Sequence, residues 1–121
     1  MLNVVALRGR LSRPPVERVL PTTGDRVLAL EVSVRRDGAP KAESVPVVWF
    51  QPPKAADGLA AGDEVVVVGH VARRFFRAGG ATQSRTEVVA STVVPVRHVR
   101  RAGGALAQAA ACLEAALAAV P

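Results

Sequence analysis

The sequence has little that would support covalent or redox chemistry. It contains a single cysteine, Cys112, so no disulfide can form within the chain, which fits a reducing cytoplasm. Its two histidines, His70 and His98, form neither a zinc-binding pattern nor a thiol–imidazole pair with that cysteine. A phosphate-binding GxxxxGK[ST] loop is also missing. We therefore expect a protein that binds rather than catalyses, without a catalytic residue, a metal or a cofactor.

Long apolar runs and aromatic residues are scarce as well. No run approaches the roughly 20 residues that span a bilayer. The chain enters a strand-like pattern at Leu2 without a charged leader, so we expect neither a membrane segment nor a signal peptide. One tryptophan and three phenylalanines are the only aromatic residues, although 50% of the 121 residues are hydrophobic. We expect one domain with an aliphatic core.

Acidic residues are outnumbered by basic ones. Ten acidic residues oppose sixteen basic ones, which gives a formal net charge of +6. Nearly all the basic residues are arginine, whose guanidinium group pairs with phosphate and stacks on bases, so the composition favours an anionic partner. A GC-rich genome would also raise the content of Arg, Ala and Val, and composition alone does not separate the two explanations.

Alternation of apolar and polar residues predicts a series of short strands. The clearest case is 26–36, in which every second residue from Leu28 to Val34 is apolar and marks a buried face. Further strands are expected at 2–11, 43–50, 65–77 and 86–96, with 16–20 as a short continuation of the first. A short element at 54–61 separates the third strand from the fourth. This order outlines an all-β domain, a five-stranded Greek-key OB-fold barrel over residues 1–96.

Two segments follow the predicted barrel. Residues 97–104 are basic and glycine-containing, and we expect a linker with a hinge at Gly103 and Gly104. Residues 105–120 are rich in alanine, which predicts a helix. Its apolar stripe consists of Leu106, Leu113, Leu117 and Val120. This stripe either packs against its own barrel or pairs with another subunit. Cys112 lies off the stripe, and we expect it to be at least half-buried.

The segment from Val65 to Arg77 carries the strongest functional signal. It begins as a run of valines and ends in Arg73, Arg74, Phe75, Phe76 and Arg77, before a glycine turn at 78–81. A strand that passes from the core into arginine and phenylalanine can hold phosphates and stack bases along one surface. The pattern predicts a hairpin that grips single-stranded nucleic acid.

Candidate contacts with nucleic acid divide into two kinds. For base stacking they are Phe50, Phe76 and Phe75. For phosphate they are Arg35, Arg36, Arg73, Arg74, Arg77 and Arg85. On the strand 43–50, the parity of Phe50 separates it from the likelier core residues Val47 and Trp49. The alternatives are phenylalanines that fill the barrel and arginines on a solvated face. A basic group at 97–101 either extends the site or belongs to the linker.

Five stretches in this order resemble the bacterial single-stranded DNA-binding protein family. They are Val4–Leu11, Arg18–Gly24, Val47–Phe50, Gly69–Phe76 and Thr86–Ala90. The resemblance covers roughly residues 2–96. It implies an OB-fold that binds single-stranded DNA without sequence specificity in replication, recombination or repair. It also implies a cytoplasmic, nucleoid-associated homo-oligomer, either a tetramer or a dimer.

Several positions match or depart from that family. Phe50 and Phe76 match two of its stacking positions. The departures are Ser44 and Arg36 at or near common aromatic positions, Val45 in place of a subunit-contact histidine, and Arg10 in place of an asparagine. Arg10 adds charge and joins the nucleic-acid candidates. The family's acidic tail, which recruits partner proteins, has no counterpart in this sequence, so we do not expect that recruitment role.

Two other functions remain open from the sequence. A divergent OB-fold with few aromatic residues can serve as a protein-interaction or assembly module, joined through the C-terminal helix. The same groove can also bind RNA.

Overall fold

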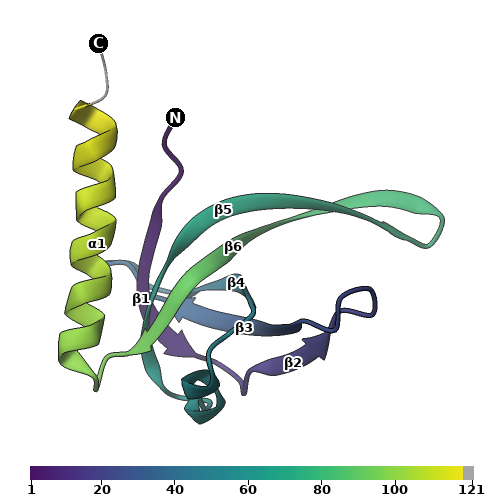
Figure 1. Cartoon of the computed structure of the whole chain (residues 1–121), viewed down its shortest axis with the longest axis horizontal. Helices are drawn as coiled ribbons and strands as arrows, with labels where there is room; N and C mark the ends of the chain where they lie inside the picture. The colour runs from purple at the N-terminus through teal and green to yellow at the C-terminus, as the bar shows by residue number, and fades with distance from the viewer. Residues whose placement is uncertain (119–121) are drawn as a thin grey trace.

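The computed structural model describes residues 1–118 as a β-barrel with one long helix beside it (Figure 1). The elements are β1 (Val5–Leu11), β2 (Val16–Val19), β3 (Arg26–Val34), β4 (Glu43–Phe50), the 3-10 helix η1 (Lys54–Gly58), β5 (Glu64–Ala78), β6 (Ala81–Pro95) and α1 (Val99–Ala118).

Five of the six strands close into a ring. The sheet order is β1-β5-β6-β4-β3-β2, and an additional pairing of β1 with β3 closes the barrel. The predicted five-stranded OB-fold with a C-terminal helix is therefore confirmed. β2 stands outside the ring as a sixth strand, paired with β3 alone. It is separated from β1 because Pro14 and Pro15 provide no N–H group to continue a ladder.

The barrel core is aliphatic, as the composition predicts. Leu28, Leu30 and Val32 point inward from β3, together with the buried Trp49 of β4. β5 begins with a run of valines because it is covered on both sides. Val65 and Val67 face the barrel interior, whereas Val66 belongs to a second cluster beneath α1.

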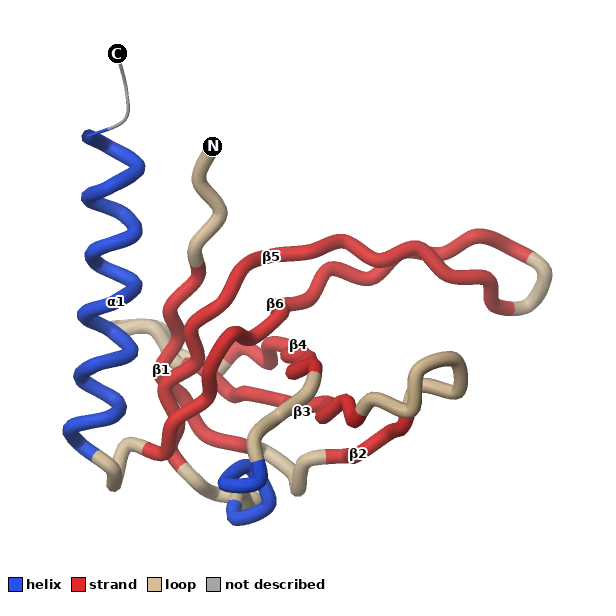
Figure 2. Tube along the Cα trace, viewed as in Figure 1, coloured by secondary structure: helices blue, strands red, loops and turns tan. Residues whose placement is uncertain are grey.

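β5 and β6 extend beyond the barrel as a long arm. Each strand has 15 residues, and Figure 2 shows that they stay side by side to the turn at the tip. Gly79 and Gly80 make this turn with φ values of 59° and 78°, which favour glycine. The prediction that the returning strand starts near residue 86 was wrong, since β6 starts at Ala81. The segment 82–85 is polar on both faces, so it shows no alternation.

The helix begins earlier than its sequence predicts. α1 starts at Val99 and includes Gly103 and Gly104, so the predicted linker over 97–104 and its hinge are wrong. Both glycines face open space, and the alanine-rich residues around them favour continuing the helix. The final residues of the predicted helix, 119–120, lie outside the described residues.

Three alanines, rather than the leucine stripe, attach α1 to the barrel. Ala102, Ala105 and Ala109 are buried, and the small side chains let the helix lie close to the valines of β5 and β6. The three leucines of the stripe that the structure describes are exposed, with Leu106 41%, Leu113 47% and Leu117 76% accessible. These leucines therefore do not pack into the barrel core.

Two further observations concern α1. Cys112 is exposed, so the prediction of a half-buried thiol was wrong; it lies on a turn of the helix beyond the last buried alanine. No helix among residues 1–118 has the length and apolarity needed to cross a membrane.

Candidate nucleic-acid interface

A groove lies between the β5–β6 arm and the outer face of β2, β3 and β4. It consists of two adjoining cavities, each of about 320 Å³, which share Arg18, Val48, Arg74 and Glu87. Val27, Val48 and Phe50 supply an apolar floor in the first cavity. Arginines from three places in the sequence line the two cavities: Arg13, Arg18, Arg74 and Arg85. The groove thus combines an apolar surface with four arginines and two acidic residues, Glu31 and Glu87.

Phe50 contributes the aromatic surface of this groove. It is 48% exposed at the end of β4, where Gln51 leaves the strand with a φ of 49°. Its neighbour Trp49 points to the other face and is only 5% exposed. The predicted division of β4 into a core face and an open face is confirmed. Phe50 is consequently free to contact a flat ligand.

Alternation along the arm sorts the other candidates onto two faces. Arg74 and Arg85 pair across the arm and line the groove. Phe76 has the same parity as Arg74, and the Arg74 guanidinium lies 5.6 Å from the centre of its ring. Arg73 and Phe75 have the opposite parity and lie on the outer face of the arm.

The outer face makes its own contacts. Arg73 lies 5.5 Å from the ring centre of Phe75 and donates a hydrogen bond to Ser84 Oγ. Arg77 donates to the carbonyl of Gly80 in the turn. The structure therefore divides a cluster that is continuous in the sequence.

Three other candidates lie outside the groove-lining residues. Arg10 donates a hydrogen bond to the carbonyl of Gly62 at the base of β5. Arg35 and Arg36 line a separate, open depression in the β3–β4 loop. There Arg36 forms an ion pair with Glu43 at 2.8 Å.

Neither Arg13 nor Arg18 was predicted to be a site residue. β2 pairs with β3 and sets Arg18 opposite Val27, which brings the guanidinium to the groove. The segment Arg18–Gly24 resembles a turn of the single-stranded DNA-binding family, which is a sequence signal for its importance. It does not indicate that the turn folds beside Phe50.

Several charged groups are already paired within the protein. Hydrogen bonds from Arg26 to Glu17 and Asp57 raise the pKa of the Arg26 guanidinium and tie β2 and η1 to β3. The hydrogen bond from Arg8 lowers the pKa of the Glu64 carboxyl below its ordinary value. These groups hold the fold together, and none of them lines the groove.

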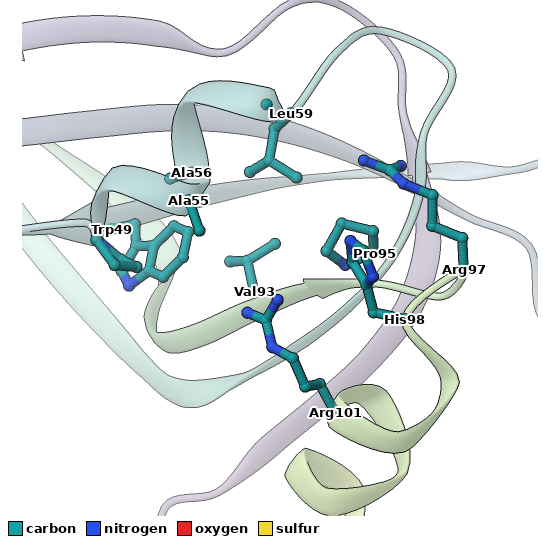
Figure 3. Close-up of a pocket in the computed structure, with 11 residues that line it drawn as sticks. Trp49, Ala55, Ala56, Leu59, Val93, Pro95, Arg97, His98 and Arg101 are labelled. Atoms are coloured by element: carbon teal, nitrogen blue, oxygen red, sulfur yellow. The ribbon is translucent and has the colours of Figure 1, made fainter.

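The basic group before α1 lies at a different place. Figure 3 shows His98, Arg97 and Arg101 around a small cavity between η1, the end of β6 and α1. Its volume is about 60 Å³, and Arg97 lies 3.4 Å from the Asp63 carboxylate. These residues therefore do not extend the groove. Within residues 1–118, no three His, Cys, Asp or Glu side chains are placed to hold a metal ion.

The closed ring with its long arm is the OB-fold of single-stranded DNA-binding proteins. One similar structure is the Plasmodium falciparum protein of this kind in complex with single-stranded DNA, with a TM-score of 0.64 and 20% identity over 78% of this chain and 95% of that one. Another is a deletion variant of the single-stranded DNA-binding protein from Thermus aquaticus, with a TM-score of 0.63 and 26% identity. That match covers 78% of this chain and 40% of the Thermus chain.

These matches confirm the resemblance that the sequence predicted. No family model matches the chain. No curated protein matches its sequence either.

Proposed function

We propose that this protein binds single-stranded DNA without reading its sequence. The observation that carries the proposal is the groove, in which Phe50 lies on an apolar floor between arginines of β2 and of the arm. The similar Plasmodium fold in complex with single-stranded DNA supports it. The process it serves is replication, recombination or repair, in the cytoplasm and at the nucleoid.

The side chains of the groove favour a single strand over a duplex. An exposed phenylalanine contacts the faces of bases, and base pairing and stacking hide those faces in a duplex. Arg18 can follow the phosphates directly. Arg74 lies 3.3 Å from Glu87 and Arg85 lies 4.0 Å from Glu31, so these two would contact phosphate through the N–H groups that the carboxylates leave free. On the arm, Phe76 offers a second ring on the same side as Arg74. Arg10, Arg35 and Arg36 would contact only strand that continues beyond the groove.

Binding to oligo-dT should be preferred over a matched duplex and should weaken with salt. If Arg18, Arg74 and Arg85 each neutralise one phosphate, log affinity should fall with log salt at a slope of about −2. Fluorescence anisotropy of an end-labelled oligonucleotide measures this. Trp49 is unsuited as a reporter because it is buried in the core. Equal affinity for the two DNAs, or no salt dependence, would contradict the proposal, and matched RNA competitors test the RNA alternative.

We also propose that α1 joins two copies of the chain. Val99, Leu106, Leu113 and Leu117 are exposed along one side of the helix, at spacings of seven, seven and four residues. When Gly103 and Ala110 are included, the spacing alternates between four and three residues. This is the pattern of the contact face between paired helices. An antiparallel pair sets Glu114 of one copy near Arg100 of the other, so the charges are complementary.

Replacing Leu106 and Leu113 together by glutamate should convert the oligomer to a monomer. Two buried charges in each helix would make the pairing unfavourable, whereas the barrel would be unaffected. Light scattering after size exclusion measures the mass, and Ala115→Glu, off the stripe, is the control. A monomeric wild-type chain would refute the pairing. An oligomer without affinity for oligo-dT would instead favour the assembly-module function.

A further inference from the structure

The groove contains a buried carboxylate with one free oxygen. Glu87 is the sole polar or charged residue among the buried positions described, at 5% exposure. Its Oε1 lies 3.3 Å from Arg74 Nε, and its Oε2 has no hydrogen-bond partner within the described protein. A buried acceptor without a partner costs about 1–3 kcal/mol. The free oxygen itself has almost no solvent-accessible surface, so it accepts a ligand N–H only when the Glu87 side chain, which lines both cavities, turns toward the groove.

The cavity beside Glu87 is lined mainly by apolar side chains. Val27, Val48, Leu20, Pro21 and Phe50 form its apolar lining, and its volume is about 320 Å³. Arg18, Arg74 and Glu87 are its charged lining residues. A ring that stacks on Phe50 would therefore meet a donor, Arg74, next to an acceptor, Glu87.

We propose that this cavity takes one unstacked base of the bound strand and favours guanine there. The inference rests on the proposed single-stranded DNA binding and adds a preference at one position of the strand. Guanine presents an acceptor, O6, beside two donors, N1–H and the 2-amino group. O6 accepts from Arg74, and both donors are directed to the carboxylate of Glu87.

The other bases satisfy this pair less well. Thymine has one N–H between two carbonyl oxygens, so one of its oxygens faces the carboxylate. Cytosine and adenine offer an amino group beside a ring acceptor, and thus a single donor group to Glu87. Guanine alone supplies two adjacent N–H groups at its pairing edge.

The test uses deoxyinosine, whose base differs from guanine only in lacking the 2-amino group. Oligo-dT with one central dG should bind about tenfold more tightly than the same strand with one central dI. Glu87→Gln should abolish this difference, because it replaces the free oxygen by an NH₂ group of similar shape. Asp37→Asn, the same charge change in the exposed β3–β4 loop, should keep it.

The outcomes separate this inference from the proposed function. If oligo-dT binds but dG and dI strands bind equally, the guanine site is refuted and the proposed function stands. The site is also refuted if Glu87→Gln keeps the guanine advantage. If no strand binds, the proposed function itself fails. Thermal unfolding of each variant shows whether the barrel is intact, and Glu87→Asp, which retains the acceptor, gives a second comparison if Glu87→Gln does not fold.

Discussion

Replacing Phe50 by alanine should weaken binding to oligo-dT by about tenfold and leave the barrel folded. The ring is 48% exposed at the groove floor and contributes little to the core. Stacking of one base on an aromatic ring contributes about 1–3 kcal/mol, and 1.4 kcal/mol corresponds to a factor of ten. Anisotropy titrations with labelled oligo-dT at one fixed salt concentration measure the loss.

Phe75→Ala is the matched control for this experiment. Phe75 is 65% exposed, but it lies on the outer face of the arm with Arg73. Its removal should change affinity by less than about twofold, because a strand in the groove does not reach that face. Equal losses for Phe50→Ala and Phe75→Ala would show that the strand binds along the outside of the arm.

Replacing Gly69 by alanine should strongly destabilise the protein. Gly69 lies at the irregularity in the pairing of β5 with β6. A Cβ atom there would overlap the backbone carbonyl of Val89, and backbone cannot move aside as a flexible side chain does. We expect a loss of about 3 kcal/mol in the free energy of unfolding, or roughly 10 °C in Tm.

Gly104→Ala provides the opposite control. Its added methyl group meets nothing within 4 Å on the exposed side of α1. Alanine favours a helix over glycine by about 1 kcal/mol, so this variant should melt at a higher temperature than the wild type. Thermal unfolding followed by circular dichroism compares both variants. A Gly69→Ala protein that unfolds at the same temperature as the wild type would contradict the close approach of β5 and β6.

The sequence predicted which types of residue form the candidate site, but it predicted only some of the residues that line it. Phe50 could be predicted because strict alternation places its side chain on the face of β4 that Trp49 does not occupy. Arg73 and Arg74 are neighbours in the sequence and were predicted together, yet only Arg74 lines the groove. Arg18 was missed as a site residue because β2 is a strand of four residues, too short to show a pattern.

The sequence by itself determined where most of the strands lie along the chain, the aliphatic core and the excess of arginine. These follow from local alternation and composition, which depend on neighbouring residues alone. Tertiary structure decided which face of the arm meets the groove, which side of α1 is buried and that Glu87 keeps an unpaired oxygen. The face of the arm and the position of Glu87 depend on strand registers. The buried side of α1 depends on the close packing of alanines against valines. Those contacts join residues that are far apart in the chain, so no local pattern encodes them.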